Sequence, residues 1–455
     1  MSMAFRTDLA GITPYQSFDA RVKARLNTNE NPYCVPDSVA KEVAKAVQES
    51  VIGANRYPSD EFHELREAFA KYIFQTDVVK FTSEQILAAN GSNELMDEVF
   101  DAFAGPSLGE DGLPNGINDR VALTFSPTYS MYPQYARDSF TKLIQVPRSG
   151  EDFSIDIEDA KRAIAKYRPS LVVIANPNNP TGTLTPQGEI RELLKFTQDV
   201  SASGSGVGAR PVVCVDEAYI DFKNSGEVAS AALVHEFSNL LVVRTLSKAF
   251  SFAGVRVGYA MSSKSVIDAL KVVRLPYNLS SVTQAIACVA LKHSSDMLRA
   301  VDEIRNARED MYAWLKTLHY ETPEFTRQKL HVVKSSANFI QLGLRLRATQ
   351  LEATELDTRQ PSDPHLEMSR KGSEYGGVQN NALMPETIHA ECESFPKRVH
   401  DFLIDRGVQI RVVGPKGYFR VTIGTPQENE LFRQGFEAFL EEVRSPKAVA
   451  KGGEQ

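Results

Sequence analysis

A lysine amine is the group in this sequence best placed to do chemistry. Lys248 lies in residues 245–250 (TLSKAF), directly after a hydrophobic run, and Arg256 follows eight residues later. Partial burial and nearby positive charge lower the pKa of an amine, which then spends time deprotonated and reactive. The surroundings of Lys248 therefore suit an amine that reacts with an aldehyde.

Further polar motifs follow predicted strands. They are residues 91–94 (GSNE) after a strand at 85–89, residues 176–182 (NPNNPTG) after one at 171–175, and residues 216–219 (DEAY) after one at 211–215. An open parallel sheet collects its ligand groups at the carboxyl ends of its strands. Small residues that open a helix, as at 91–94, also form an anion site. We expect these motifs and Lys248 to meet in one site.

The elements that must position these motifs alternate along the chain. Amphipathic helical segments separate short apolar runs at 85–89, 120–125, 171–175, 211–215, 240–243 and 255–260. This alternation predicts an α/β fold with a mostly parallel sheet. Near-continuous runs such as residues 171–174 (LVVI) fit strands that are covered on both faces.

The chain divides into an arm and two domains. We predict an N-terminal arm at 1–35, a large domain at 36–290 and a small C-terminal domain at 291–455, entered through a long helical stretch at 281–318. The small domain has strands near 338–342, 409–413 and 418–423 and helices near 394–406 and 427–442. A polar, Gly/Ser/Pro-containing insertion spans about 345–390, and shorter loops of this kind occur at 105–119 and 201–208.

Composition excludes several classes of protein. The chain has 455 residues and a net charge of −7 without a basic run, so nucleic acid and anionic membranes are not its expected partners. Its cysteines show no CxxC pair, which predicts neither a disulfide framework nor a metal site; they are Cys34, Cys214, Cys288 and Cys392. No apolar stretch approaches the roughly 20 residues of a membrane span. The first eight residues also lack the apolar core of a signal peptide, so we expect a cytoplasmic protein.

Taken together, the motifs resemble in order and spacing the fold-type I pyridoxal 5′-phosphate (PLP) enzymes of the class I/II aminotransferase group. The resemblance runs from about residue 26 to 423, apart from the insertions. It implies a mostly parallel seven-stranded sheet flanked by helices, a smaller α+β C-terminal domain, and PLP as cofactor. It also implies that Lys248 is the catalytic residue, which binds PLP covalently and later moves the proton of the substrate's Cα.

The same resemblance assigns groups to the cofactor ring. Asp216 would pair with the pyridine nitrogen, and Asn179 and Tyr219 would donate hydrogen bonds to the phenolate oxygen. Tyr129 would stack on the ring face. Each has a purely structural alternative: a helix N-cap for Asp216, a turn residue for Asn179, and a core aromatic for Tyr129.

The cofactor phosphate needs positive charge and many donors. The resemblance assigns it Ser92, Asn93, Thr245, Ser247 and Arg256. We place Arg256 in an apolar strand, where a charge is costly unless it meets an anion.

Tyr57, in residues 55–58 (NRYP), matches the family residue that reaches the phosphate from a neighbouring subunit. The resemblance therefore also implies a homodimer with shared active sites.

Within this group the greatest resemblance is to the histidinol-phosphate aminotransferase family. It is carried by residues 26–33 (LNTNENPY), 55–58, 407–411 and 420–425. It implies amino transfer between glutamate or 2-oxoglutarate and histidinol phosphate or imidazole-acetol phosphate, in histidine biosynthesis. Arg420 would bind the glutamate carboxylate and the substrate phosphate in turn, with Arg411 beside it for the phosphate. Asn29, in the arm, would close over the imidazole. Both arginines have an alternative as ordinary surface charges.

Other functions share these motifs. An aromatic amino-acid aminotransferase has a similar arm and arginines, and a phosphothreonine-type decarboxylase uses the same cofactor groups. A PLP-binding regulator is an alternative from another class. It would carry an N-terminal DNA-binding region, for which the roughly 25 residues before the motif at 26–33 leave little room.

Overall fold

A computed structural model of the chain describes residues 9–12, 21–108, 120–204, 209–323, 325–344, 354–356 and 386–445. The predicted loop at 201–208 is described only in its first half. Most of the predicted loop at 105–119 and of the insertion at 345–390 lies outside the described residues.

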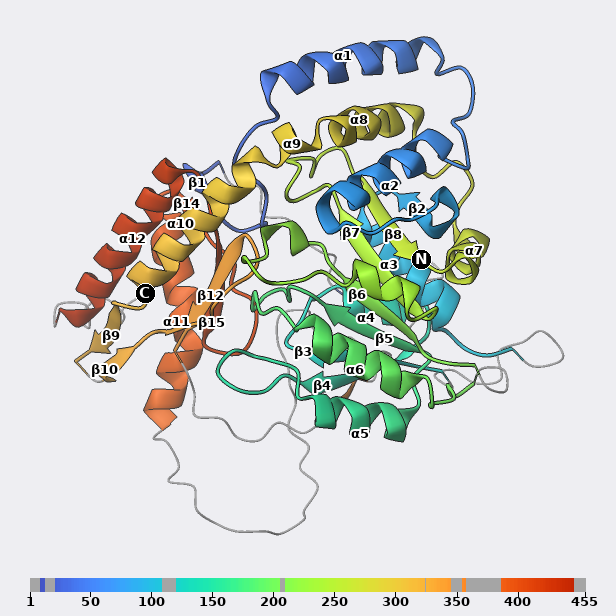
Figure 1. Cartoon of the computed structure of the whole chain (residues 1–455). Helices are drawn as coiled ribbons and strands as arrows, with labels where there is room; N and C mark the ends of the chain where they lie inside the picture. The colour runs from blue at the N-terminus through green and yellow to red at the C-terminus, as the bar shows by residue number, and fades with distance from the viewer. Residues whose placement is uncertain are drawn as a thin grey trace, which may run out of the picture.

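An eight-stranded sheet lies at the centre of the molecule (Figure 1), in the order β13-β4-β3-β5-β6-β7-β8-β2. Strands β4, β3, β5, β6 and β7 are mutually parallel, and β8 is antiparallel to both β7 and β2. The bounds are β2 Ile86–Ala89, β3 Val121–Ser126, β4 Lys142–Pro147, β5 Leu171–Ala175, β6 Val212–Asp216, β7 Leu240–Thr245, β8 Gly258–Ser262 and β13 Thr354–Leu356.

The predicted mostly parallel, seven-stranded sheet is confirmed, with two differences in detail. Strand β4 was not located from the sequence because its partly buried pattern lacks the continuous apolar run of the central strands. Strand β13 lies within the predicted insertion and extends the sheet antiparallel to β4.

Helices cover both faces of the sheet, and each strand alternates between two buried clusters. In β5, Val172 and Ile174 belong to the cluster with α2, α5 and α6, whereas Leu171 and Val173 belong to the cluster with α3, α4 and α7. These helices are α2 His63–Asp77, α3 Ser92–Phe103, α4 Tyr132–Asp138, α5 Ile157–Tyr167, α6 Gln187–Thr197 and α7 Lys264–Val273. Because side chains alternate across a strand, burial on both faces explains the near-continuous apolar runs.

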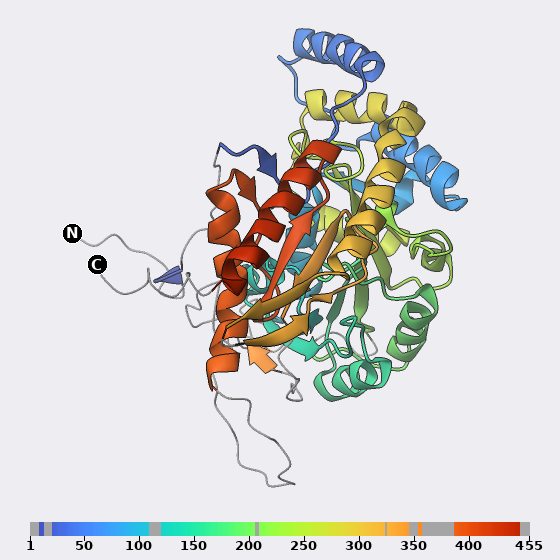
Figure 2. The same cartoon turned by 90° about the vertical axis from the view of Figure 1, so that its left-hand side faces the viewer.

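The predicted long helical stretch is divided into α8 Ser281–Lys292, α9 Ser294–Met297 and α10 Arg299–Leu315, and α1 Asp37–Ile52 packs along α8. The small C-terminal part lies to one side of the central sheet, at the left in Figure 1, and faces the viewer in Figure 2. It holds the antiparallel sheet β11-β12-β15, the hairpin β9–β10, and helices α11 and α12. Their bounds are β9 His319–Thr322, β10 Phe325–Lys329, β11 His331–Val332, β12 Phe339–Gly343, β15 Tyr418–Thr422, α11 Glu386–Ile404 and α12 Pro426–Arg444.

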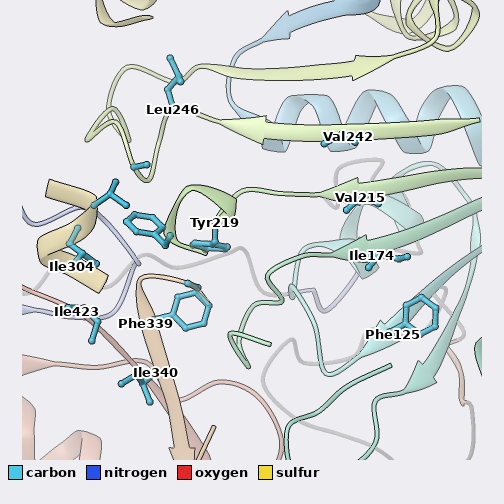
Figure 3. Close-up of a cluster of buried hydrophobic side chains, with 14 of the residues drawn as sticks. Phe125, Ile174, Val215, Tyr219, Val242, Leu246, Ile304, Phe339, Ile340 and Ile423 are labelled. Atoms are coloured by element: carbon cyan, nitrogen blue, oxygen red, sulfur yellow. The ribbon is translucent and has the colours of Figure 1, made fainter. Parts of the chain in front are cut away.

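The N-terminal arm is tied to the C-terminal part of the chain. Strand β1 Ala24–Arg25 pairs in parallel with β14 Val408–Gln409. The arm and the C-terminal part also share one hydrophobic cluster with the large sheet, in which the rings of Tyr219, after β6, and Phe339, of β12, meet edge to face at a centroid distance of 5.1 Å (Figure 3). The arm, the large sheet and the small sheet therefore meet where β6 ends.

Within the described part of the chain, no helix is long and apolar enough to cross a membrane. No group of three or more His, Cys, Asp or Glu side chains is placed to hold a metal ion among those residues.

Candidate active site

The predicted motifs meet at one edge of the sheet. Strands β2, β3, β5, β6 and β7 all end at this edge, and β8 begins there, because β8 runs antiparallel to its two neighbours. The loop after each of these strands therefore delivers its side chains to one place, as predicted.

Lys248 is partly buried in the loop after β7. Its Nζ donates a hydrogen bond to the carbonyl oxygen of Thr28 in the arm, at 3.0 Å, and lies 5.8 Å from the ring centroid of Tyr219. Burial and the positive charge of Arg420 lower the pKa of the Lys248 amine to about 8, and the more modest contribution of Arg256 acts in the same direction. The lowered pKa that we expected for this amine is therefore present, but Arg420 lowers it more than Arg256 does.

Asp216 is buried at the end of β6. One carboxylate oxygen accepts from the hydroxyl of Tyr132 at 2.9 Å, and the other accepts from the backbone N–H of Ala218 at 3.1 Å. Burial raises the pKa of Asp216 to about 6, and these two hydrogen bonds oppose that rise. Tyr132 was missed in the sequence because it lies in a helix without a polar motif; its position one helical turn after Tyr129 was the available signal.

The hydroxyl of Tyr219 joins the arm to the loop after β5. It accepts from the amide of Asn29 at 3.0 Å and from the amide of Asn179 at 3.4 Å. Asn29 is buried and has positive φ, and its amide oxygen accepts from the hydroxyl of Thr422 on β15. Asn29 therefore orients Tyr219 in this structure; its predicted contact with substrate stays a prediction.

An anion cradle forms where α3 begins. Gly91 caps the helix with φ of 89°, and the first N–H groups of a helix, here from Ser92 and Asn93, have no partner within the helix. The guanidinium of Arg256 lies so close to Gly91 that a side chain on Gly91 would collide with it.

Arg256 does not lie in a strand, contrary to the prediction. Strand β8 begins two residues later, and Arg256 is partly buried in the preceding loop with φ of 63°. The predicted strand at 255–260 therefore begins in the loop, and only its last three residues belong to β8. Arg256 Nη1 donates to Ser247 Oγ at 3.3 Å, and Thr245 Oγ1 accepts from the Ser247 amide at 3.1 Å. Three residues predicted to bind phosphate are thus in contact.

Arg420 and Arg411 lie directly opposite each other in an antiparallel bridge. Residues opposed in this way project to the same face of a sheet. Arg420 is buried and donates to the side-chain oxygen of Asn179 and, at 2.7 Å, to the carbonyl oxygen of Asn27. Arg411 is partly buried. The geometry brings Arg420 beside the loop after β5 and beside the Lys248 amine, whose pKa it lowers.

The two remaining aromatic residues lie differently. Tyr129 is partly buried, its hydroxyl donates to Asn93 at 3.3 Å, and its ring meets Tyr132 edge to face. Tyr57 is 81% exposed and stacks on Tyr277 at 4.5 Å, so it presents its ring outward.

Comparison with known proteins bears on this arrangement. Residues 21–435 match the family model "Aminotransferase class I and II". A histidinol-phosphate aminotransferase of Bifidobacterium longum is 37% identical over 98% of both chains, and one of Thermobifida fusca is 35% identical over 95% of this chain and 94% of that protein.

Solved structures share the fold at lower identity. A histidinol-phosphate aminotransferase from Sinorhizobium meliloti, solved in complex with PLP, has a TM-score of 0.66 at 18% identity, covering 93% of this chain and 92% of that chain. An aspartate aminotransferase from Thermus thermophilus with maleate has a TM-score of 0.68 at 19% identity, covering 97% and 100%.

Proposed function

Because the chain belongs to the class I and II aminotransferase family, we propose that it is a PLP-dependent enzyme of histidine biosynthesis. It transfers an amino group between glutamate and imidazole-acetol phosphate, which gives 2-oxoglutarate and histidinol phosphate. The observation that carries this proposal is the Lys248 amine of lowered pKa, set between a buried carboxylate, an anion cradle and a buried arginine.

The residues fit PLP. The Gly91–Asn93 backbone, Arg256, Ser247 and Thr245 would hold its phosphate, in a cradle that a side chain at position 91 would fill. Asp216 would hold the ring nitrogen, Asn179 and Tyr219 the phenolate oxygen, and Tyr129 the ring face. When bound, PLP supplies an aldehyde that takes up the amino group and a ring that withdraws electrons.

The protein's own groups then have defined tasks. With a pKa near 8, the Lys248 amine is a base of suitable strength to accept a proton from substrate carbon and return it. Arg420 orients the substrate by its anionic group. Asp216, buried from water, keeps a negative charge at the ring nitrogen, where electron withdrawal is needed.

The cradle gives a first prediction. We expect Gly91→Ala to weaken PLP binding by about tenfold, because the new methyl group strains a residue with positive φ and displaces the Arg256 guanidinium that meets the phosphate. Fluorescence titration of the apoprotein with PLP measures this. Gly254→Ala is the matched control, since Gly254 is in the same loop as Arg256 and a Cβ there meets no atom within 4 Å. Unchanged PLP affinity in Gly91→Ala would remove the cradle from the proposal.

The substrate assignment is supported by the two arginines and by the names of the relatives. A substrate that carries a phosphate needs a second anion site beside the one for the cofactor. Arg420 and Arg411 project to one face of their strand pair and can form it. The rival aromatic aminotransferase has similar arginines, so the titration with phenylalanine and histidinol phosphate described below distinguishes the two.

A homodimer is part of the proposal. Tyr57 presents its ring outward and stacks on Tyr277, and further exposed apolar side chains occur at the end of α1 (Val51 and Ile52) and after α7 (Leu275). Burial of this surface against a second copy would remove apolar area from water and would carry Tyr57 toward the partner's phosphate site. A cytoplasmic location also remains part of the proposal, and cell fractionation tests it.

The proposal as a whole is tested by a visible spectrum of the purified protein with PLP, titrated separately with glutamate, histidinol phosphate and phenylalanine. We expect glutamate and histidinol phosphate to bleach the band of the protein-bound cofactor, and phenylalanine to have little effect. A stronger response to phenylalanine would favour an aromatic aminotransferase. Absence of any protein-bound cofactor band would overturn the proposed function.

A further inference from the structure

The hydroxyl of Tyr132 contacts the carboxylate on which the proposed cofactor site depends. Tyr132 is the first residue of α4 and is fully buried, in the cluster that also holds Met96 and Cys214. Its hydroxyl lies 2.9 Å from one oxygen of Asp216. A phenol hydroxyl in such surroundings normally finds a partner, and here the partner is a charged group.

Few other groups stabilise that charge. The backbone N–H of Ala218 donates to the second carboxylate oxygen at 3.1 Å. The neighbouring carboxylate of Glu217 is paired with Arg244 at 2.8 Å, and its other oxygen accepts from the Ser230 backbone. Arg244 therefore neutralises Glu217 rather than Asp216. The titratable or charged groups that face the Tyr132–Asp216 pair are Cys214 and Glu217 from β6 and its end, Tyr129 and Tyr135 from the α4 segment, and Arg148 from beyond β4.

We propose that Tyr132 is a positioning residue, which holds the Asp216 carboxylate oriented and ionised for pairing with the protonated ring nitrogen of the cofactor. The inference rests on the proposed function and adds a residue that sequence reasoning did not assign. Both acceptor oxygens of Asp216 have a fixed donor, so the carboxylate is held in one orientation before any ligand arrives.

The charge state follows from the same contacts. Burial raises the pKa of Asp216 to about 6, and the hydrogen bond from Tyr132 is the largest influence that lowers it again. Loss of this donor should therefore raise the pKa of Asp216 further, toward neutral pH. A protonated Asp216 would have to lose its proton before pairing with a pyridinium group, so affinity for the cofactor would fall as the pH falls.

Tyr132 also connects two parts of the site. Its ring meets Tyr129 edge to face at a centroid distance of 5.6 Å. Tyr129 is the residue proposed to stack on the cofactor ring, so one short segment orients both the group at the ring face and the group at the ring nitrogen.

The helix supplies a matched control. Tyr135 lies three residues along α4 in the same cluster, and its hydroxyl is buried without a hydrogen-bond partner in the described residues. Tyr135→Phe thus removes a buried hydroxyl and no hydrogen bond, whereas Tyr132→Phe removes the hydroxyl that serves Asp216. Both variants keep the ring, and near-UV circular dichroism checks that both fold.

The test is calorimetric titration of the apoprotein with pyridoxamine 5′-phosphate between pH 6 and 9. This ligand carries the ring nitrogen and the phosphate but no aldehyde, so the reaction with Lys248 does not enter the measurement. At pH 6 we expect Tyr132→Phe to bind about fivefold more weakly than wild type, since a rise of one unit from a pKa of about 6 lowers the ionised fraction of Asp216 from about one half to about one tenth. The deficit should shrink as the pH approaches 9, where Asp216 is ionised in both proteins. Tyr135→Phe should follow wild type throughout.

The outcomes separate the alternatives. A deficit of the same size at every pH would indicate a merely structural role for Tyr132 and overturn the proposal, as would wild-type affinity throughout. If the wild-type protein binds neither PLP nor pyridoxamine phosphate, the proposed function itself fails. Should Tyr132→Phe not fold, 3-fluorotyrosine incorporated at position 132 provides a more acidic donor, and the pH profile of binding should then move to lower pH. An unmoved profile would count against the proposal.

Discussion

Lys248→Ala is expected to lower kcat/KM for transamination by more than about ten-thousandfold, because the variant lacks the amine that is proposed both to bond to the cofactor and to move the substrate's proton. An assay of 2-oxoglutarate release from glutamate, with imidazole-acetol phosphate as acceptor, measures this. Lys248→Arg is the matched control: it keeps a positive charge near Thr28 but provides no reactive amine. Equal inactivity of both variants would show that the amine is essential, whereas substantial turnover in either would refute the role of Lys248.

The stability of the same variant tests the environment of the amine. Burial and Arg420 lower the pKa of Lys248 to about 8 from an ordinary value of 10.5, so the unfolded chain holds this proton more tightly than the folded one. Lys248 therefore costs folded stability below about pH 8, and the cost disappears as the pH rises toward 10.5. We expect Lys248→Ala to fold and to lose little or no stability at pH 7 in chemical denaturation.

The parts of the site that could be predicted from sequence are those set by a single strand and the loop after it. Asp216 and Lys248 each follow a buried apolar run, and the carboxyl ends of parallel strands meet at one edge. Arg256 was placed wrongly in a strand because an apolar run alone does not show where backbone pairing begins. Its φ is positive, which is incompatible with an extended strand, and β8 begins only after it.

The parts that could not be predicted depend on tertiary contacts. Tyr132 has no sequence motif, and its contact with Asp216 exists only because α4 packs on the face of the sheet behind β6. Backbone groups that contact the site are a second case of what sequence does not predict, since every residue has a carbonyl. The carbonyl oxygens of Asn27 and Thr28 accept from Arg420 and Lys248.

These contacts give the arm a role in organising the site. Three consecutive residues, Asn27, Thr28 and Asn29, contact Arg420, Lys248 and Tyr219 in turn. The arm therefore contacts the three groups that are proposed to bind the substrate (Arg420), the cofactor aldehyde (Lys248) and the cofactor phenolate oxygen (Tyr219). Lys248 and Arg420 both donate to carbonyl oxygens of the arm, which links the position of these two groups to the position of the arm.

Arg420→Ala is expected to lower kcat/KM by about a hundredfold or more for both glutamate and histidinol phosphate, because its buried guanidinium is proposed to bind the carboxylate of the first and the phosphate of the second. The loss should lie mainly in KM. Initial rates in both directions, at saturating PLP, measure it. Saturation matters because Arg420 also supports Asn179, which is proposed to contact the cofactor, so part of the loss could otherwise reflect weaker cofactor binding.

Arg411→Ala is the matched comparison, because Arg411 is paired with Arg420 across the same two strands. It is proposed to assist only the phosphate, so its removal should raise KM for histidinol phosphate and leave that for glutamate nearly unchanged. Arg420→Lys keeps the charge but not the two-point contact and should fall between wild type and Arg420→Ala for both substrates. If Arg420→Ala impairs only one of the two substrates, they do not share an anion site. In that case separate groups must bind the two substrates, and Arg411 is the first candidate to bind the substrate that Arg420→Ala leaves unimpaired.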